Sequence, residues 1–178
     1  NEFVPQILVG ATGTLDVDGI VITPDVIVQP DPWVADTSGG NVAMTVLEDP
    51  ERAHDSLGLM VLKTSGGGTN GIRHDIALTP AVGDYYTGSV WIRSQSGTPV
   101  AGRFELTTLG GSAAPVSATF QADSAWQLVS VRLPITSAGH TGLRARVLST
   151  TPGVELDVDD VNVGKEIWRS FSSGPALS

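Results

Sequence analysis

Apolar and polar residues alternate along most of this chain with the period of two that is typical of β-strands. The clearest case is Tyr86–Arg93, where the even positions are small or apolar and the odd positions carry Thr, Ser, Trp and Arg. Successive side chains of a strand point to opposite faces. We therefore expect one face of this strand in a core, with Trp91 and Arg93 on the other face.

Short turns separate such segments along the whole chain. Clusters such as Ser65–Gly68 and Ser96–Pro99 combine Gly, Pro, Ser and Thr, which favour turns. Many short strands joined in this way predict an all-β fold, namely a two-sheet antiparallel β-sandwich of the jelly-roll kind. Glu48–Ser56 is the one segment that predicts a helical turn. The predicted strands are Thr14–Ile22, Asn41–Leu47, Leu57–Thr64, Gly71–Leu78, Tyr85–Ser94, Ala101–Leu109, Val116–Phe120, Ala125–Leu133, Leu143–Ser149 and Val154–Val163.

Composition narrows the classes of protein. A length of 178 residues suits one domain, with 1–30 as an extra N-terminal hairpin or strand, 31–164 as the sandwich, and 165–178 as a last strand and linker. The absence of cysteine excludes disulfides, thiolate metal sites and a cysteine nucleophile. A net charge of −9 argues against nucleic acid or an anionic membrane surface as partner. No apolar run reaches the length of a membrane span, so we expect no membrane insertion.

Seven segments stand in the order of a known family. From Trp33 to Val163 the chain resembles the jelly-roll carbohydrate-binding modules of families four, nine and twenty-two. The resemblance implies a non-catalytic domain that binds a polysaccharide or oligosaccharide in a sheet groove. It also implies a secreted or extracellular setting, bacterial or phage, with attachment to a glycoside hydrolase or another host protein. The matching segments are Leu57–Val61, Asp75–Pro80, Tyr86–Arg93, Arg103–Leu106, Ala118–Phe120, Trp126–Val131 and Leu156–Val161.

An indole beside a guanidinium suits a sugar, because the C–H face of the sugar stacks on a ring while its hydroxyls meet polar groups. Trp91 and Arg93 are therefore the leading glycan-binding candidates, with Tyr85 as a second exposed ring. The alternative is that Trp91 packs under a loop. Strand parity adds further outward-facing candidates, which could also be ordinary cross-strand ion pairs: Arg73, Asp75, Arg103 and Glu105.

Three carboxylates near the end of the last predicted strand raise the question of a metal. Asp157, Asp159 and Asp160 lie within four residues and repel one another unless a cation or backbone amides compensate. Oxygen ligands suit calcium, and the resemblance implies a structural calcium held by Asp159 and Asp160; a plain acidic turn is the alternative. The family pairs this region with an early acid, for which the candidates are Asp16, Asp18 and Asp31.

Enzyme motifs are missing from the sequence, which contains no Gly-x-Ser-x-Gly elbow, His-Glu-x-x-His helix or P-loop. A glycosidase needs two facing carboxylates, and Asp75 with Glu105 is the pair the chain offers. We therefore expect a binding module and not an enzyme. A structural or adhesive jelly roll of a surface or phage-tail protein, which contacts another protein subunit, is the second hypothesis, and a sandwich hydrolase is the third.

Overall fold

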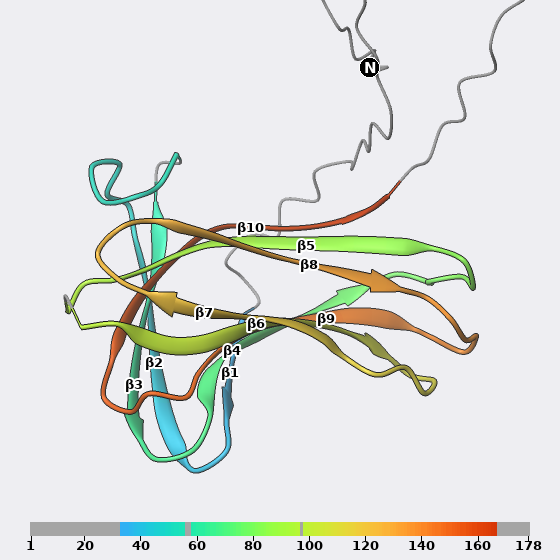
Figure 1. Ribbon diagram of the computed structural model, residues 1–178, viewed down its shortest axis with the longest axis horizontal. Helices are drawn as coiled ribbons and strands as arrows, with labels where there is room; N and C mark the ends of the chain where they lie inside the picture. The colour runs from blue at the N-terminus through green and yellow to red at the C-terminus, as the bar shows by residue number, and fades with distance from the viewer. Residues whose placement is uncertain (1–32, 56–57, 97, 167–178) are drawn as a thin grey trace, which may run out of the picture.

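The computed structural model describes residues 33–55, 58–96 and 98–166, and in this part of the chain it contains ten strands and no helix (Figure 1). The predicted N-terminal hairpin of residues 1–30 and nearly all of the predicted C-terminal segment lie outside the described residues. No described segment is a helix long and apolar enough to cross a membrane. The strands are β1 (Val34–Thr37), β2 (Gly40–Leu47), β3 (Leu59–Gly66), β4 (Asn70–Ala77), β5 (Tyr85–Ser94), β6 (Val100–Leu109), β7 (Val116–Ala122), β8 (Gln127–Pro134), β9 (Gly142–Ser149) and β10 (Glu155–Lys165).

The strands form two five-stranded antiparallel sheets packed face to face, which confirms the predicted β-sandwich. Sheet I has the order β1-β4-β9-β6-β7, and sheet II has the order β2-β3-β10-β5-β8. Nine of the ten predicted strands are present with ends shifted by a few residues, and the tenth, Thr14–Ile22, lies outside the described residues. The alternation did not predict β1, because four residues are too few to show a period of two.

The core lies between the two sheets, on the faces that strand parity assigned to it. Val90 and Ile92 of β5 and Phe104 and Leu106 of β6 have no exposed surface. Gly102 makes room within this core, because a Cβ at that position would lie 2.3 Å from the ring of Phe120. The inner faces are therefore filled, so any ligand site on a sheet has to use an outer face.

A second, smaller core covers part of the outer face of sheet II. Leu59 and Val61 of β3 pack there with Ala53, and Leu47 and Trp126 lie against them. The segment Glu48–Asp55 covers this cluster. Its predicted helical turn is a single turn, in which the N–H groups of Arg52 and Ala53 donate to the carbonyl of Asp49. The turn does not continue into a helix. Arg52 instead donates to Asp157 of the sheet, and Ala53 packs in the smaller core.

Candidate functional site

Trp91 lies on the outer face of β5 beneath the segment Glu48–Asp55. The ring of His54 stacks on the indole, with 3.7 Å between ring centroids and 19° between the planes. The backbone N–H of His54 donates to Asp159 (2.8 Å), and the ring of Trp126 meets His54 edge-on at 5.7 Å. One face of the predicted sugar platform is therefore covered by the protein itself.

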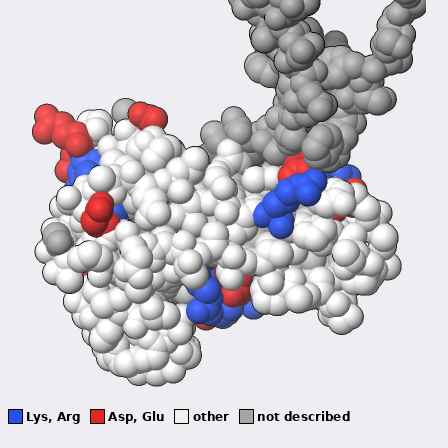
Figure 2. All heavy atoms as spheres, viewed as in Figure 1, with Lys and Arg blue, Asp and Glu red and all other residues white. Residues whose placement is uncertain are grey.

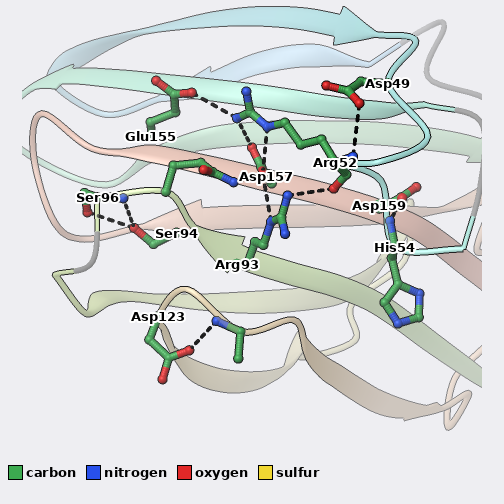
Figure 3. A network of polar contacts seen from close by, with 12 residues as sticks. Asp49, Arg52, His54, Arg93, Ser94, Ser96, Asp123, Glu155, Asp157 and Asp159 are labelled. Carbon is green, nitrogen blue, oxygen red and sulfur yellow. Dashed lines mark hydrogen bonds and ion pairs between the residues drawn. The ribbon is translucent and has the colours of Figure 1, made fainter.

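Arg93 belongs to a polar network that ends on a buried carboxylate (Figure 3). Asp157 of β10 has no exposed surface and accepts hydrogen bonds from Arg93 Nε (2.9 Å), Arg52 Nε (3.0 Å) and Gln95 Nε2 (2.6 Å). Arg93 also donates to the backbone carbonyl of Arg52 (2.6 Å), and its guanidinium lies 4.6 Å above the ring of Trp126. The hydrogen bonding of Arg52 to the Asp157 carboxylate is the main cause that raises the pKa of Arg52 above its ordinary value. The network attaches the segment Glu48–Asp55 to sheet II, and the hydrogen bonds of Arg93 are part of that attachment.

A shallow hollow of about 350 Å³ lies above this network. Its two guanidinium groups, those of Arg52 and Arg93, are already paired with Asp157. Asp49 on its rim accepts hydrogen bonds from the backbone N–H groups of Glu51 and Arg52. The hollow therefore offers hydroxyl, amide and carboxylate groups to a ligand, whereas both of its guanidinium groups are already paired.

Asp159 and Asp160 give an incomplete set of ligands for calcium. The two carboxylate oxygens of Asp159 accept the backbone N–H groups of His54 and Asp160, and an oxygen of Asp160 lies 3.2 Å from His54 Nδ1. The described part of the chain contains no group of three metal-ligating side chains, whereas calcium takes six to eight oxygens. The early acids that would complete a site, Asp16, Asp18 and Asp31, lie outside the described residues, and calcium stays a prediction.

Tyr85 lies on the same outer face of β5 as Trp91, but six residues away, which is about 20 Å along a strand. The guanidinium of Arg132 from β8 lies 4.0 Å above its ring. Arg132 in turn pairs with Glu166 (2.8 Å). Tyr85 and Trp91 therefore do not form one platform, and each ring already has a protein group on it.

The other predicted residues lie on the outer face of sheet I, in three rows that cross the strands. Arg103 of β6 lies in the row of Asp36, Gly71 and Leu148. The register of the strands places Arg73 of β4, Arg146 of β9 and Glu105 of β6 side by side. The next row contains Asp75, Arg144 and Thr107. In Figure 2 the lower margin of the molecule, where Figure 1 places sheet I, is hollowed between two lobes, and charged atoms gather in the hollow.

Ion pairs connect most of these side chains across the strands of sheet I. Arg146 bridges Asp36 of β1 (2.6 Å) and Glu105 (2.7 Å), and Glu105 also accepts from Arg103 (3.3 Å). Hydrogen bonding to Asp36 is the main cause that raises the pKa of Arg146. Gly71 of β4 lies between Asp36 and β9 in the register. Because it has no side chain, Arg146 can reach across β4 to Asp36. The network therefore joins side chains from three strands, β1, β9 and β6.

Arg144 and Asp75 form a separate, two-point pair. Arg144 Nε and Nη2 donate to the two oxygens of Asp75 at 2.6 and 2.7 Å. This hydrogen bonding lowers the pKa of the Asp75 carboxyl below its ordinary value. Arg73 lies beside this pair but has no ion pair with any described residue, and its buried Nε finds no hydrogen-bond acceptor there.

The predicted site residues therefore divide between the two outer faces of the sandwich. Trp91, Arg93 and Tyr85 lie on sheet II, whereas the other four candidates lie on sheet I. Sequence reasoning missed the roles of Asp36, because its strand was not predicted, and of Arg52 and His54, because nothing local links them to Asp157 or Trp91. The residues brought together on sheet I are Arg73, Asp75, Arg103 and Glu105.

Comparison with solved structures supports the jelly-roll fold. The chain is similar to the CBM22-1 xylan-binding domain of Paenibacillus barcinonensis Xyn10C (TM-score 0.56, 17% identity), covering 75% of this chain and 85% of that one. It is also similar to a family 11 carbohydrate-binding module of Clostridium thermocellum in complex with a β-1,3-1,4-mixed-linked tetrasaccharide (TM-score 0.55, 13% identity, 84% and 97% covered). No family model matches the sequence, and no curated protein matches it.

Larger proteins contain the same fold as one part. The chain is similar to a portion of the enzymatically active domain of tailspike protein 4 of bacteriophage CBA120 (TM-score 0.62, 13% identity), which covers 76% of this chain. This chain spans about a fifth of the tailspike structure (19%) and a quarter (25%) of an α-L-arabinofuranosidase that it also resembles. With family 22 among the matches, the resemblance to jelly-roll carbohydrate-binding modules is confirmed at the level of the fold.

Proposed function

We propose that this chain is a carbohydrate-binding module that binds a glycan across the outer face of sheet I. The observation that carries the proposal is the network of Asp36, Arg146, Glu105 and Arg103, which joins strands β1, β9 and β6 on the outer face of sheet I. Sugar hydroxyls are recognised by planar polar side chains that are held in place before the ligand arrives. The ion pairs of the network supply such preorganised groups.

Asp75 and Glu105, the two carboxylates that a glycosidase would use here, are both engaged by arginines, which supports binding without catalysis. One of the two acids of a glycosidase has to be protonated near neutral pH. Arg144 lowers the pKa of Asp75, and Glu105 accepts hydrogen bonds from two arginines. The guanidinium of Arg144 stabilises the ionised form of Asp75 and so opposes the role of general acid for this carboxyl.

A binding module of this kind acts by holding its host near a polysaccharide. The host is an attached enzyme or another protein, and the place of action is outside the cell, where polysaccharides are found. The similar structures include a xylan-binding domain and a module in complex with a tetrasaccharide, which supports a carbohydrate as the ligand.

The test is a binding assay on a panel of insoluble polysaccharides and arrayed oligosaccharides, with wild type and two variants. Arg103→Ala removes a part-exposed guanidinium from sheet I (32% side-chain exposure) and should weaken binding about tenfold, as expected for loss of charge-assisted hydrogen bonds. Trp91→Ala, on the opposite face, should leave binding unchanged. Loss of binding in a folded Trp91→Ala protein with full binding in Arg103→Ala would move the site to sheet II. Failure of the wild type to bind any glycan would overturn the function.

The second candidate is an assembly module, which the edge of sheet II favours. Strand β2 is at that edge, and its Met44 and Val46 are 38% and 54% exposed. An edge strand offers unpaired backbone groups to a second chain, and the similar tailspike structure shows the fold within a phage-tail protein. A concentration-dependent dimer in light scattering, lost in Val46→Lys, is the result that this candidate predicts.

A further inference from the structure

We infer that the glycan bound by sheet I is acidic and that one of its carboxylates pairs with Arg73. This inference rests on the proposed function and specifies the class of ligand. It follows from the balance of charge on this face, from the surroundings of one arginine, and from the kinds of side chain that the face displays.

The outer face of sheet I carries more positive than negative charge, although the whole chain has a net charge of −9. The described strands carry four guanidinium groups and three carboxylates on this face. Two-point pairing with Arg144 uses both oxygens of Asp75, and Asp36 and Glu105 pair with the other two arginines. The guanidinium groups are those of Arg73, Arg103, Arg144 and Arg146, and the carboxylates are those of Asp36, Asp75 and Glu105.

Of these four arginines, Arg73 is the one that forms no ion pair with a described carboxylate. Its neighbours in the register are Val34 of β1, which is 45% exposed, and Arg146 of β9. Two arginines side by side repel each other, and Arg146 is compensated by its own two acids. Arg73 forms no ion pair with a described carboxylate, although its charge acts on nearby Asp75, and its buried Nε has no acceptor among the described residues. A carboxylate from outside would supply the missing charge.

The rows of side chains on this face contain no aromatic ring among the described residues. They comprise charged side chains, small residues, the hydroxyls of Thr107, Ser117 and Thr119, the amide of Gln121, and the aliphatic Val34, Leu109 and Leu148. Neutral polysaccharides are commonly held by stacking on rings. Without a ring, recognition falls to hydrogen bonds and charge, and a planar guanidinium binds a carboxylate with two parallel hydrogen bonds. A uronic-acid glycan offers this group together with the hydroxyls that the paired residues bind.

The experiment compares each acidic glycan with its own methyl ester, which keeps the sugar backbone and removes the charge. The probes are oligogalacturonate, alginate oligosaccharide and glucuronoxylan oligosaccharide, each free and esterified, titrated calorimetrically into wild type, Arg73→Ala and Lys63→Ala. Lys63→Ala is the matched control, since this substitution also removes one positive charge. Lys63 lies on sheet II, and its side chain is 63% exposed. Circular dichroism and thermal unfolding verify that both variants are folded.

At least one free acid should bind about tenfold or more tightly than its ester, the size expected for one charge-assisted contact. Arg73→Ala should reduce the affinity for the acid to that for the ester, and Lys63→Ala should preserve the difference. Equal affinity for acid and ester, or a preference that survives in folded Arg73→Ala, would overturn the inference and leave the proposed function standing. Absence of binding to every glycan, charged or neutral, would overturn the proposed function itself.

Discussion

Arg93 and Asp157 face each other in the register of the neighbouring strands β5 and β10, and Arg93 Nε lies 2.9 Å from an oxygen of Asp157. The carboxylate has no exposed surface, and two arginines supply the pairing that a buried carboxylate needs. Its second arginine, Arg52, comes from the segment that covers Trp91. This pair therefore connects the packing of sheet II to the accessibility of the indole.

Removing the buried carboxylate should destabilise the domain strongly. Asp157→Ala leaves Arg52 and Arg93 without their shared acceptor, and loss of one partner of a buried pair costs about 3 kcal/mol. Urea unfolding measures the change. Glu155→Ala is the control, because Glu155 pairs with Arg52 in a more exposed position (31% side-chain exposure) and should cost about 1 kcal/mol or less. Equal losses for the two variants would contradict the structural role assigned to Asp157.

Adding one methyl group to the core at Gly102 should be harmful. The new Cβ of Gly102→Ala would lie 2.3 Å from the Phe120 ring and 2.4 Å from the carbonyl of Leu148. Neither neighbour can withdraw freely, so we expect a loss of about 1–3 kcal/mol. Gly67→Ala serves as control, since no atom lies within 4 Å of that position. Thermal unfolding of the two variants compares them, and a Gly102→Ala protein as stable as Gly67→Ala would refute the predicted packing.

The Asp75–Arg144 pair should make stability depend on pH in the acidic range. Because hydrogen bonding to Arg144 lowers the pKa of Asp75 below 3.8 in the folded protein, the pair stabilises the fold above that pH. Its contribution decreases as pH falls below 3.8 and disappears below the lowered pKa. Wild type should therefore be more stable than Asp75→Asn at neutral pH, with the difference shrinking on acidification. Urea titrations at neutral pH and near pH 3 measure it, and a difference that grows in acid would show the sign to be wrong.

His54 should hold the segment Glu48–Asp55 against sheet II. The His54→Ala variant loses the stacking on Trp91 and the edge contact with Trp126, which together are worth about 1 kcal/mol. We expect faster hydrogen exchange at the amides of Arg52 and Ala53, whose acceptor is Asp49, with little change in β6 or β9. Val82→Ala, at a 60% exposed position, provides the control. Unchanged exchange at Arg52 and Ala53 would show that the other contacts of the segment suffice.

The sequence by itself determined the class of the fold and the direction of its strand side chains. Alternation predicted nine described strands, and it correctly placed Val90 and Ile92 in the core. Period two is a local property of the backbone, so it can be read without knowing which strands are neighbours.

Only the tertiary structure decided how the candidate residues group. Parity directed Trp91 and Arg73 outward alike, but strand pairing between distant segments put them on opposite sheets. The stacking of His54 on Trp91, the two arginines on Asp157 and the bridging of Asp36 to Glu105 by Arg146 join residues separated by 37 to 110 positions. Such contacts depend on the packing of the whole chain, and no local pattern of residues records them.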